Sequence, residues 1–214
     1  MELDLALTTT RSVRRRLDLD RPVERSVVEE CLEVAFQAPN GWNLQLWRWV
    51  IVDDPDLRAA MADIYRASAG GYSDRTVTAA EPSPPRGDAE IRMTESVMHL
   101  FEHLQDVPVL VVPTMAGRME DASVFHQATR WGSMIPAVWS FMLALRDRGL
   151  GSSWTTIHLH REREMAELLG IPYDRHTQVG LFPVAYTIGD DFRAAPRRPV
   201  RDVAAWNAWP TRPR

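Results

Sequence analysis

The stretch from Glu120 to Arg148 constrains the fold most, because it predicts a long helix that is apolar on much of its circumference. Such a helix has to be covered on several sides, and a single domain of this size offers limited cover of its own. The same helix of a second subunit is one suitable cover, so the pattern favours a dimer. Pro136 lies inside the stretch and is expected to kink or interrupt the helix.

Shorter helices and strands alternate along the rest of the chain. Apolar residues at helical spacing predict helices at Glu2–Thr9 and Ser26–Ala38, and Ser26 with Glu29 forms a capping-box pattern. Other expected helices cover residues 53–68, a segment ending near 105, and 160–170, and the expected strands are 46–52, 107–114, 149–156 and 178–189. About four strands among helices indicate an α/β or α+β fold.

Charge and composition exclude several classes of partner. The chain has 25 basic and 29 acidic side chains, a net charge of −4, which argues against nucleic acid or an anionic membrane. No apolar run is long enough to span a bilayer, and Cys31, the single cysteine, has no internal disulfide partner, so a reducing cytoplasm is expected. Every basic residue is arginine, so arginine or protonated histidine has to hold any anion.

The stretch APNGWNLQLW, residues 38–47, places two amides among large apolar side chains. Asn43 and Gln45 either satisfy backbone groups in a tight loop or bind a ligand. Trp42 lies between Gly41 and Asn43, where a flat side chain can stack on a flat ligand, whereas Trp47 is expected in the core. A second segment, Ala69–Asp88, is rich in glycine and proline and is interpreted as a surface loop or lid.

Arginines gather in TTTRSVRRRL near the start of the chain. The simplest interpretation is a solvated basic turn. The alternative is a phosphate grip, since Arg11 and Arg14 are three residues apart and Ser12 adds a hydroxyl. Nucleic-acid binding through residues 14–16 is a weaker hypothesis because the chain is acidic overall. Arg197 in the tail is by itself a weak signal.

The sequence contains no recognisable hydrolytic or metal site. His99 and His103 have metal-compatible spacing on one helix face but no clear third ligand. His158 and His160 alternate at an expected strand end and also lack a partner set. The acidic, hydroxyl and imidazole side chains within 121–126 are too close together on one helix for a catalytic triad. A cofactor would therefore have to supply the reactive atoms of any enzyme built on this chain.

Taken in order, the motifs resemble the nitroreductase family of flavin mononucleotide (FMN) enzymes. The resemblance starts at TTRSVRRRL, continues through the helix ending in AP, the loop NGWNLQ and the strand LWRWVIV, and reaches VPVLVV. It then takes in GSMIPAVWSFMLALRDRGLGSSWTT and the closing RRPVRDVAAW. The order covers the chain from Arg11 nearly to its end.

The resemblance implies an α+β fold with a mixed, largely antiparallel sheet flanked by helices. It also implies an obligate homodimer that binds two flavins at the subunit interface. Residues 1–214 would form one domain, with 69–88 as the lid and 190–214 as an arm wrapping the partner subunit.

Site residues also follow from the resemblance, residue by residue. Arg11, Ser12 and Arg14 would hold the flavin phosphate and ribityl chain, with Arg197 closing on the phosphate. From the other subunit, Pro39, Asn40 and Gly41 would pack on the ring, while Asn43 and Gln45 bond to its polar parts. Trp154, Thr155 and Thr156 would line the pyrimidine edge, mainly through backbone groups. No catalytic side chain and no metal are implied.

The implied activity is ping-pong transfer of hydride from NAD(P)H through FMN to a nitroaromatic, a quinone or a similar acceptor. Trp42 stands where the family usually has a small side chain, so it would narrow the substrate cleft. Two alternatives are a non-catalytic, redox-sensing flavin dimer and a reductase that uses a deazaflavin as donor.

Overall fold

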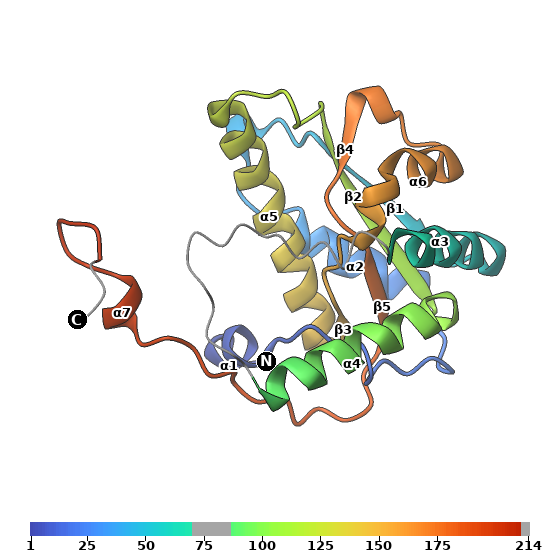
Figure 1. The fold of residues 1–214 in the computed structure, drawn as a ribbon, viewed down its shortest axis with the longest axis horizontal. Coiled ribbons are helices and arrows are strands. Elements are labelled where there is room, and N and C mark those ends of the chain that lie inside the picture. The colour runs from blue at the N-terminus through green and yellow to red at the C-terminus, as the bar shows by residue number, and fades with distance from the viewer. Residues whose placement is uncertain (70–86, 211–214) are drawn as a thin grey trace.

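The structure, a computed structural model, describes residues 1–69 and 87–210 (Figure 1). Residues 70–86 of the expected lid lie outside this described part. The helices are α1 Leu3–Thr9, α2 Arg25–Ala35, α3 Pro55–Ala67, α4 Asp88–His103, α5 Val124–Asp147, α6 Glu162–Leu169 and α7 Val200–Val203. Short 3-10 helices are η1 Gly41–Asn43, η3 Leu104–Asp106, η4 Ile157–Arg161 and η5 Tyr173–Arg175.

A five-stranded sheet forms the centre of the fold. Its strands are β1 Trp47–Val52, β2 Val109–Ala116, β3 Leu150–Ser152, β4 His176–Gln178 and β5 Phe182–Tyr186. Their order is β1-β2-β5-β3, with β4 also pairing with β2, and each of these pairings is antiparallel. An isolated parallel bridge joins Ser12 to Ser152. The expected α+β fold with a largely antiparallel sheet is confirmed.

The last predicted strand, residues 178–189, contains β5, and only its first residue, Gln178, belongs to β4, which the sequence did not predict. β4 and β5 both pair with β2, and the chain between them turns away at Gly180. A Cβ atom on Gly180 would lie 2.4 Å from Trp154 Nε1, so the glycine leaves room for that indole. Leu181 pairs with Thr155 instead of with a neighbouring strand, which brings the 154–156 segment against the sheet.

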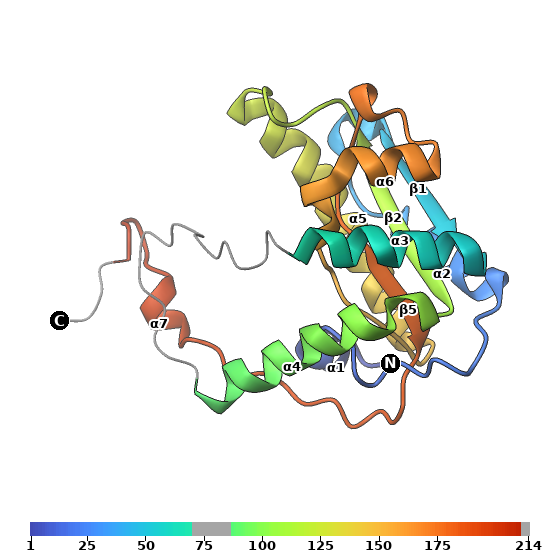
Figure 2. The same ribbon diagram turned by 45° about the vertical axis from the view of Figure 1, so that its right-hand side comes forward.

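The sheet separates two apolar cores. Val109, Val111 and Met115 of β2 face α2 and α5, while Leu110 and Val112 face α3, α4 and α6. This division follows from the two-residue period of a strand. Figure 2 shows α3, α4 and α6 in front of the strands and α5 behind them.

Two local predictions about the helices are wrong. α2 begins at Arg25 after Glu24, with no side-chain cap, so the capping box at Ser26 does not form. α5 runs for 24 residues through Pro136 without interruption. Pro136 deprives Gly132 O of its helical donor, but Gly132 is exposed, so water can replace the lost bond.

Several apolar side chains stay uncovered in the single chain. Ile135 and Trp139 of α5 are 45% and 37% exposed, and α1 exposes three leucines. The chain beyond Phe192 leaves the body (Figures 1 and 2), and its Trp206 and Trp209 are almost fully exposed. None of the described helices is both long and apolar enough to cross a membrane.

Candidate functional site

The N-terminal arginine segment lies directly on β3. Val13 N donates to Ser152 O at 2.8 Å, next to the bridge between Ser12 and Ser152. A Cβ atom on Gly151 would lie 3.0 Å from Val13 Cβ and 2.7 Å from Thr187 Cγ2. The missing side chain at Gly151 therefore permits the close approach of Val13 to β3, so Arg11 and Arg14 lie on either side of a contact with Ser152, two residues before Trp154.

The arginines of this segment differ in their surroundings. Arg15 pairs with Glu95 at 3.4 Å, and Arg16 pairs with Asp191 at 2.8 Å. Arg11 is half-buried and has no carboxylate partner in the described part of the chain. Arg11 is therefore available to an anion, as the phosphate-grip hypothesis requires, whereas Arg15 and Arg16 already have carboxylate partners.

The 154–156 segment is held from both sides. Thr155 N donates to Leu181 O at 3.1 Å, Leu181 N donates to Thr155 O at 2.8 Å, and the Thr155 hydroxyl bonds to the Tyr65 hydroxyl at 2.9 Å. Trp154 Nε1 donates to Val179 O at 3.1 Å. Both backbone polar groups of Thr155 are thus already bonded, so ligand contacts through this segment fall to its neighbours. Thr156 is exposed.

The sequence did not single out two serines just before this segment, Ser152 at the end of β3 and Ser153 after it. The hydroxyls of Ser152 and Ser153 are buried, and neither has a hydrogen-bond partner among the described residues. Buried hydroxyls without partners are uncommon and call for a water or ligand. The only available signal was their position before Trp154, which does not separate them from core serines.

The loop from Pro39 to Gln45 rests on the first half of α5. Gly41 N donates to Ser133 Oγ at 3.0 Å, and a Cβ atom on Gly41 would lie 3.2 Å from Thr129 Cγ2. Figure 1 shows this loop beside the start of α5, whereas α1 lies beside its end. The terminal amine of Met1 pairs there with Asp147 at 2.7 Å.

The side-chain amides of this loop differ in role: one bonds to the backbone of the loop, and two are left able to bind a ligand. Gln45 N donates to Asn40 Oδ1 at 3.0 Å, so Asn40 satisfies backbone within the loop. The side chains of Asn43 and Gln45 meet each other at 3.4 Å and are exposed, which leaves them able to bind a ligand. A hollow of about 460 Å³ lies beside them, lined also by residues 36–40.

Trp42 projects outward from this loop. Its side chain is 92% exposed, and its φ of 55° is in the left-handed region, as are those of Asn43 and Gln45. Such backbone conformations cost non-glycine residues on the order of 1 kcal/mol or more each and cluster at functional sites. The loop therefore keeps the Trp42 indole in solvent despite the free-energy cost of these backbone conformations. This supports a ligand-binding role for Trp42.

Arg197 lies on the C-terminal arm. It is exposed, and its Nη1 donates to Pro196 O at 3.1 Å. The structure does not bring it together with Arg11 or Arg14 through any contact of its own, and its role at a phosphate stays a prediction.

His158 is fully buried just beyond the 154–156 segment. Neither ring nitrogen has a hydrogen-bond partner in the described structure, and burial lowers the pKa of His158 to about 4. The nearby Gln178 opposes this shift only in part. The imidazole is therefore neutral at physiological pH.

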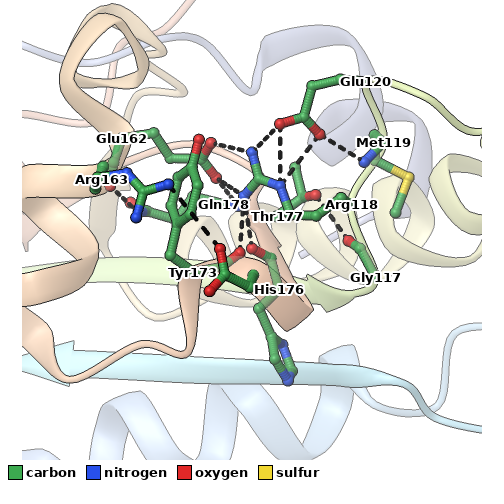
Figure 3. Close-up of polar contacts among 11 residues, drawn as sticks. Gly117, Arg118, Met119, Glu120, Glu162, Arg163, Tyr173, His176, Thr177 and Gln178 are labelled. Carbon is green, nitrogen blue, oxygen red and sulfur yellow. Dashed lines mark hydrogen bonds and ion pairs between the residues drawn. The ribbon is translucent and has the colours of Figure 1, made fainter.

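Gln178, which lies near His158, is held by the polar network that Figure 3 shows. Gln178 N donates to Glu162 Oε1 and Gln178 Nε2 donates to Glu162 O, both at 2.8 Å. Arg118 binds Glu162 at 2.7 Å, donates to His176 O at 2.8 Å and also pairs with Glu120. These bonds join the end of β2 to β4 and α6, and the glutamates hold the pKa of Arg118 above its usual value.

The other histidine pair forms a local contact. The rings of His99 and His103 lie 4.5 Å apart, and His103 Nδ1 lies 3.1 Å from Asp106 Oδ2. In residues 1–69 and 87–210, no three side chains of the metal-binding types gather to hold an ion.

Comparison with known proteins gives a consistent family. The profile of the Nitroreductase family matches residues 7–186. An NADH dehydrogenase of Thermus thermophilus is 41% identical over 64 residues, which make up 29% of this chain and 30% of that protein. An iodotyrosine deiodinase of Drosophila melanogaster is 26% identical over 180 residues, 82% of this chain and 59% of that one. The chain thus matches less than two thirds of the length of both relatives.

A solved structure extends the likeness to the whole fold. The FMN and NADPH-dependent nitroreductase of sphigopyxis sp. strain HMH superposes with a TM-score of 0.71 at 19% identity. The match covers 98% of this chain and 100% of that chain. At this identity the likeness establishes a shared fold.

The close approach at Gly151 leads to the first prediction. Gly151→Ala should lower the free energy of unfolding by about 1–3 kcal/mol, because the added methyl collides with Val13 and Thr187. Gly132→Ala is the matched control, since a methyl there meets no atom of the chain within 4 Å and alanine favours a helix by up to about 1 kcal/mol. Urea unfolding measures both. Equal stability of the two variants would show that the contact of Val13 with β3 is loose.

His158 predicts a pH dependence of stability. Its folded pKa of about 4 lies below the ordinary 6.5, so the unfolded chain takes up a proton first as the pH falls. The contribution of His158 to the free energy of unfolding is complete above pH 6.5 and is lost as the pH falls from 6.5 to 4. The free energy of unfolding should therefore be lower by about 2 kcal/mol at pH 5 than at pH 7 because of this group. His158→Gln should remove this part of the pH dependence, measured by urea unfolding at both pH values. His160→Gln, at an exposed neighbour, should leave it unchanged, and identical curves for the two variants would contradict the assignment.

Proposed function

The chain belongs to the nitroreductase family, and on that premise we propose that it is an FMN-dependent oxidoreductase. In this proposal, hydride passes from NAD(P)H through the flavin to a small organic acceptor by a ping-pong mechanism. The contact of Val13 with Ser152 carries the proposal, because it sets Arg11 and Arg14 beside the strand that leads into residues 154–156.

The residues around this contact fit an FMN molecule. Arg11 is a half-buried guanidinium without a carboxylate, which suits a phosphate. Each charge-assisted hydrogen bond from Arg11 or Arg14 to that phosphate would contribute about 1.5–3 kcal/mol. The unpartnered hydroxyls of Ser152 and Ser153 supply the further polar groups that a flavin's ribityl chain and ring edge require.

Bound FMN would supply the redox chemistry by accepting hydride at N5 and passing it on. The chain's own contribution is orientation: Trp154 is fixed by Val179 and Phe182, and Thr155 by Leu181, so the edge they form is rigid. No side chain of the described site has to act as a base.

A second copy of the chain would complete the site. The loop from Pro39 to Gln45 sits at the opposite end of α5 from α1, so it suits a partner's flavin better than the protomer's own. The exposed Ile135 and Trp139 of α5 would form part of that interface. The arm from residue 190 would cover the partner subunit, and the two tryptophans and Arg197 of the arm would then contact that subunit.

The acceptor depends on Trp42, which would border the cleft. Nitroaromatics and quinones are flat molecules that an indole can stack on. The second candidate is a redox-sensing flavin dimer without turnover, which a bulky Trp42 favours by narrowing the cleft. A deazaflavin donor in place of a nicotinamide is a variant of the first proposal.

Colour and bleaching test the proposal. The purified protein should be yellow, with absorbance bands in the blue and near ultraviolet that disappear when NADH or NADPH is added without oxygen. Re-oxidation by a quinone or nitroarene should restore them. Stable reduction without turnover would favour the redox sensor, and a colourless protein that does not take up FMN would end the flavin proposal.

Replacing single arginines tests the phosphate grip. Arg14→Ala should weaken FMN binding at least about tenfold, since one charge-assisted bond contributes 1.4 kcal/mol or more. Arg15→Ala is the matched control, because its exposed pair with Glu95 should leave FMN binding within about twofold. Fluorescence titration of the apoprotein with FMN measures both. Equal losses would place the phosphate elsewhere.

A further inference from the structure

Arg130 of α5 lies in a notch that a glycine leaves open. A Cβ atom on Gly117 would lie 2.0 Å from Arg130 Nη1 and 2.9 Å from Nη2, so the guanidinium occupies the space that a side chain at 117 would take. Gly117 has a φ of +91°, which side-chain-bearing residues rarely adopt. The backbone conformation thus selects glycine at 117, and Arg130 fills the space that the glycine leaves open.

The notch is rigid because its backbone is bonded on both sides. Gly117 N donates to Arg175 O at 2.6 Å, and the Thr177 hydroxyl donates to Gly117 O at 2.8 Å, as Figure 3 shows for Thr177. The end of β2 is therefore fixed against β4. The guanidinium rests on a surface that does not have to rearrange to receive a ligand.

The guanidinium of Arg130 has no partner of opposite charge in the described chain. Arg130 is half-buried and takes part in no ion pair or hydrogen bond there, whereas the neighbouring Arg118 binds Glu120 and Glu162. A guanidinium presents five N–H donors, and partial burial removes water from some of them. Such a group is stabilised when a ligand supplies the acceptors.

Arg130 also lies beside the loop that carries Trp42. The flanking residues Thr129 and Ser133 of α5 support Gly41, the residue before Trp42. Ala116 N donates to Leu46 O at 3.0 Å, so Gly117 adjoins the other end of the same loop. Residues next to Arg130 and Gly117 thus contact both ends of the loop that carries Trp42, so a ligand at this loop could present an aromatic ring to the indole and a negative charge to the guanidinium.

We propose that Arg130 binds the anionic group, a carboxylate or a phosphate, of the ligand that reaches the loop of residues 40–46. The inference rests on the proposed function, in which that loop borders the cleft. A guanidinium binds both groups through two parallel hydrogen bonds, and a chain without lysine has to use arginine for this task. The anion comes from an aromatic acceptor that bears a carboxylate or from the phosphates of the nicotinamide donor.

Isothermal titration of the oxidised protein tests this without requiring turnover. The titrants are 4-nitrobenzoate, its uncharged analogue 4-nitrobenzamide, and NADP⁺. Arg130→Gln should weaken at least one charged titrant tenfold or more and leave the amide within twofold. A loss for 4-nitrobenzoate assigns the site to the acceptor, and a loss for NADP⁺ assigns it to the donor.

Two further variants keep the test specific. Arg130→Lys retains the charge and should recover part of the lost affinity, while Arg161→Gln removes an exposed charge from the end of η4 and should change nothing. Equal weakening of charged and uncharged titrants, or no preference for the charged ones in the unmodified protein, would overturn the proposal. A protein that shows the charge preference but is never reduced by a nicotinamide would contradict the proposed function alone.

Discussion

Val13 donates its amide hydrogen to Ser152 O across a gap that exists because residue 151 has no side chain. This contact joins the first 14 residues to a strand that begins at residue 150, so it closes a long loop of chain. The position of Arg11 and Arg14 relative to residues 154–156 depends on it. Gly180 likewise lacks a side chain where a neighbouring group comes close, and the space that it leaves open holds the Trp154 ring. Two glycines thus set the width of the candidate flavin site.

α5 supports both parts of this arrangement. Ser133 in its first half holds the loop at Gly41, and Asp147 at its end holds the amine of Met1. These two residues are 14 positions apart, which is about 21 Å along a helix. A single protomer therefore presents the aromatic loop and the N-terminal helix at separate ends of one rigid element. In the proposed site, which two chains form together, the aromatic loop of one chain would meet the N-terminal end of the other.

Much of the fold was predictable because local patterns and tertiary packing agree. The entrance of α3 at Asp54 and Pro55 and the left-handed end of α6 at Gly170 follow from local chemistry. The errors arose where packing overrides such chemistry. α5 continues through Pro136 because its exposed side lets water replace a bond, and the strand beyond Gln178 breaks because Trp154 occupies the space beside Gly180.

For the candidate site, the sequence named residues whose role in binding stays a prediction. Residues of one segment, such as Arg11 and Ser12, could be named from their motif. Residues defined by a neighbour from another segment could not: Ser152 and Ser153 are distinguished by missing partners, and Arg130 by a glycine 13 positions earlier. Asn40 accepts a hydrogen bond from Gln45 N, and its expected packing on a flavin ring stays a prediction.

The central claim is that the segment held on β3 binds a flavin phosphate next to residues 154–156. A crystal structure of the protein loaded with FMN tests it most directly. The account predicts the phosphate within hydrogen-bond distance of Arg11 or Arg14, and the pyrimidine edge of the ring beside Trp154 and Thr156. A flavin bound with its phosphate away from both arginines would contradict it.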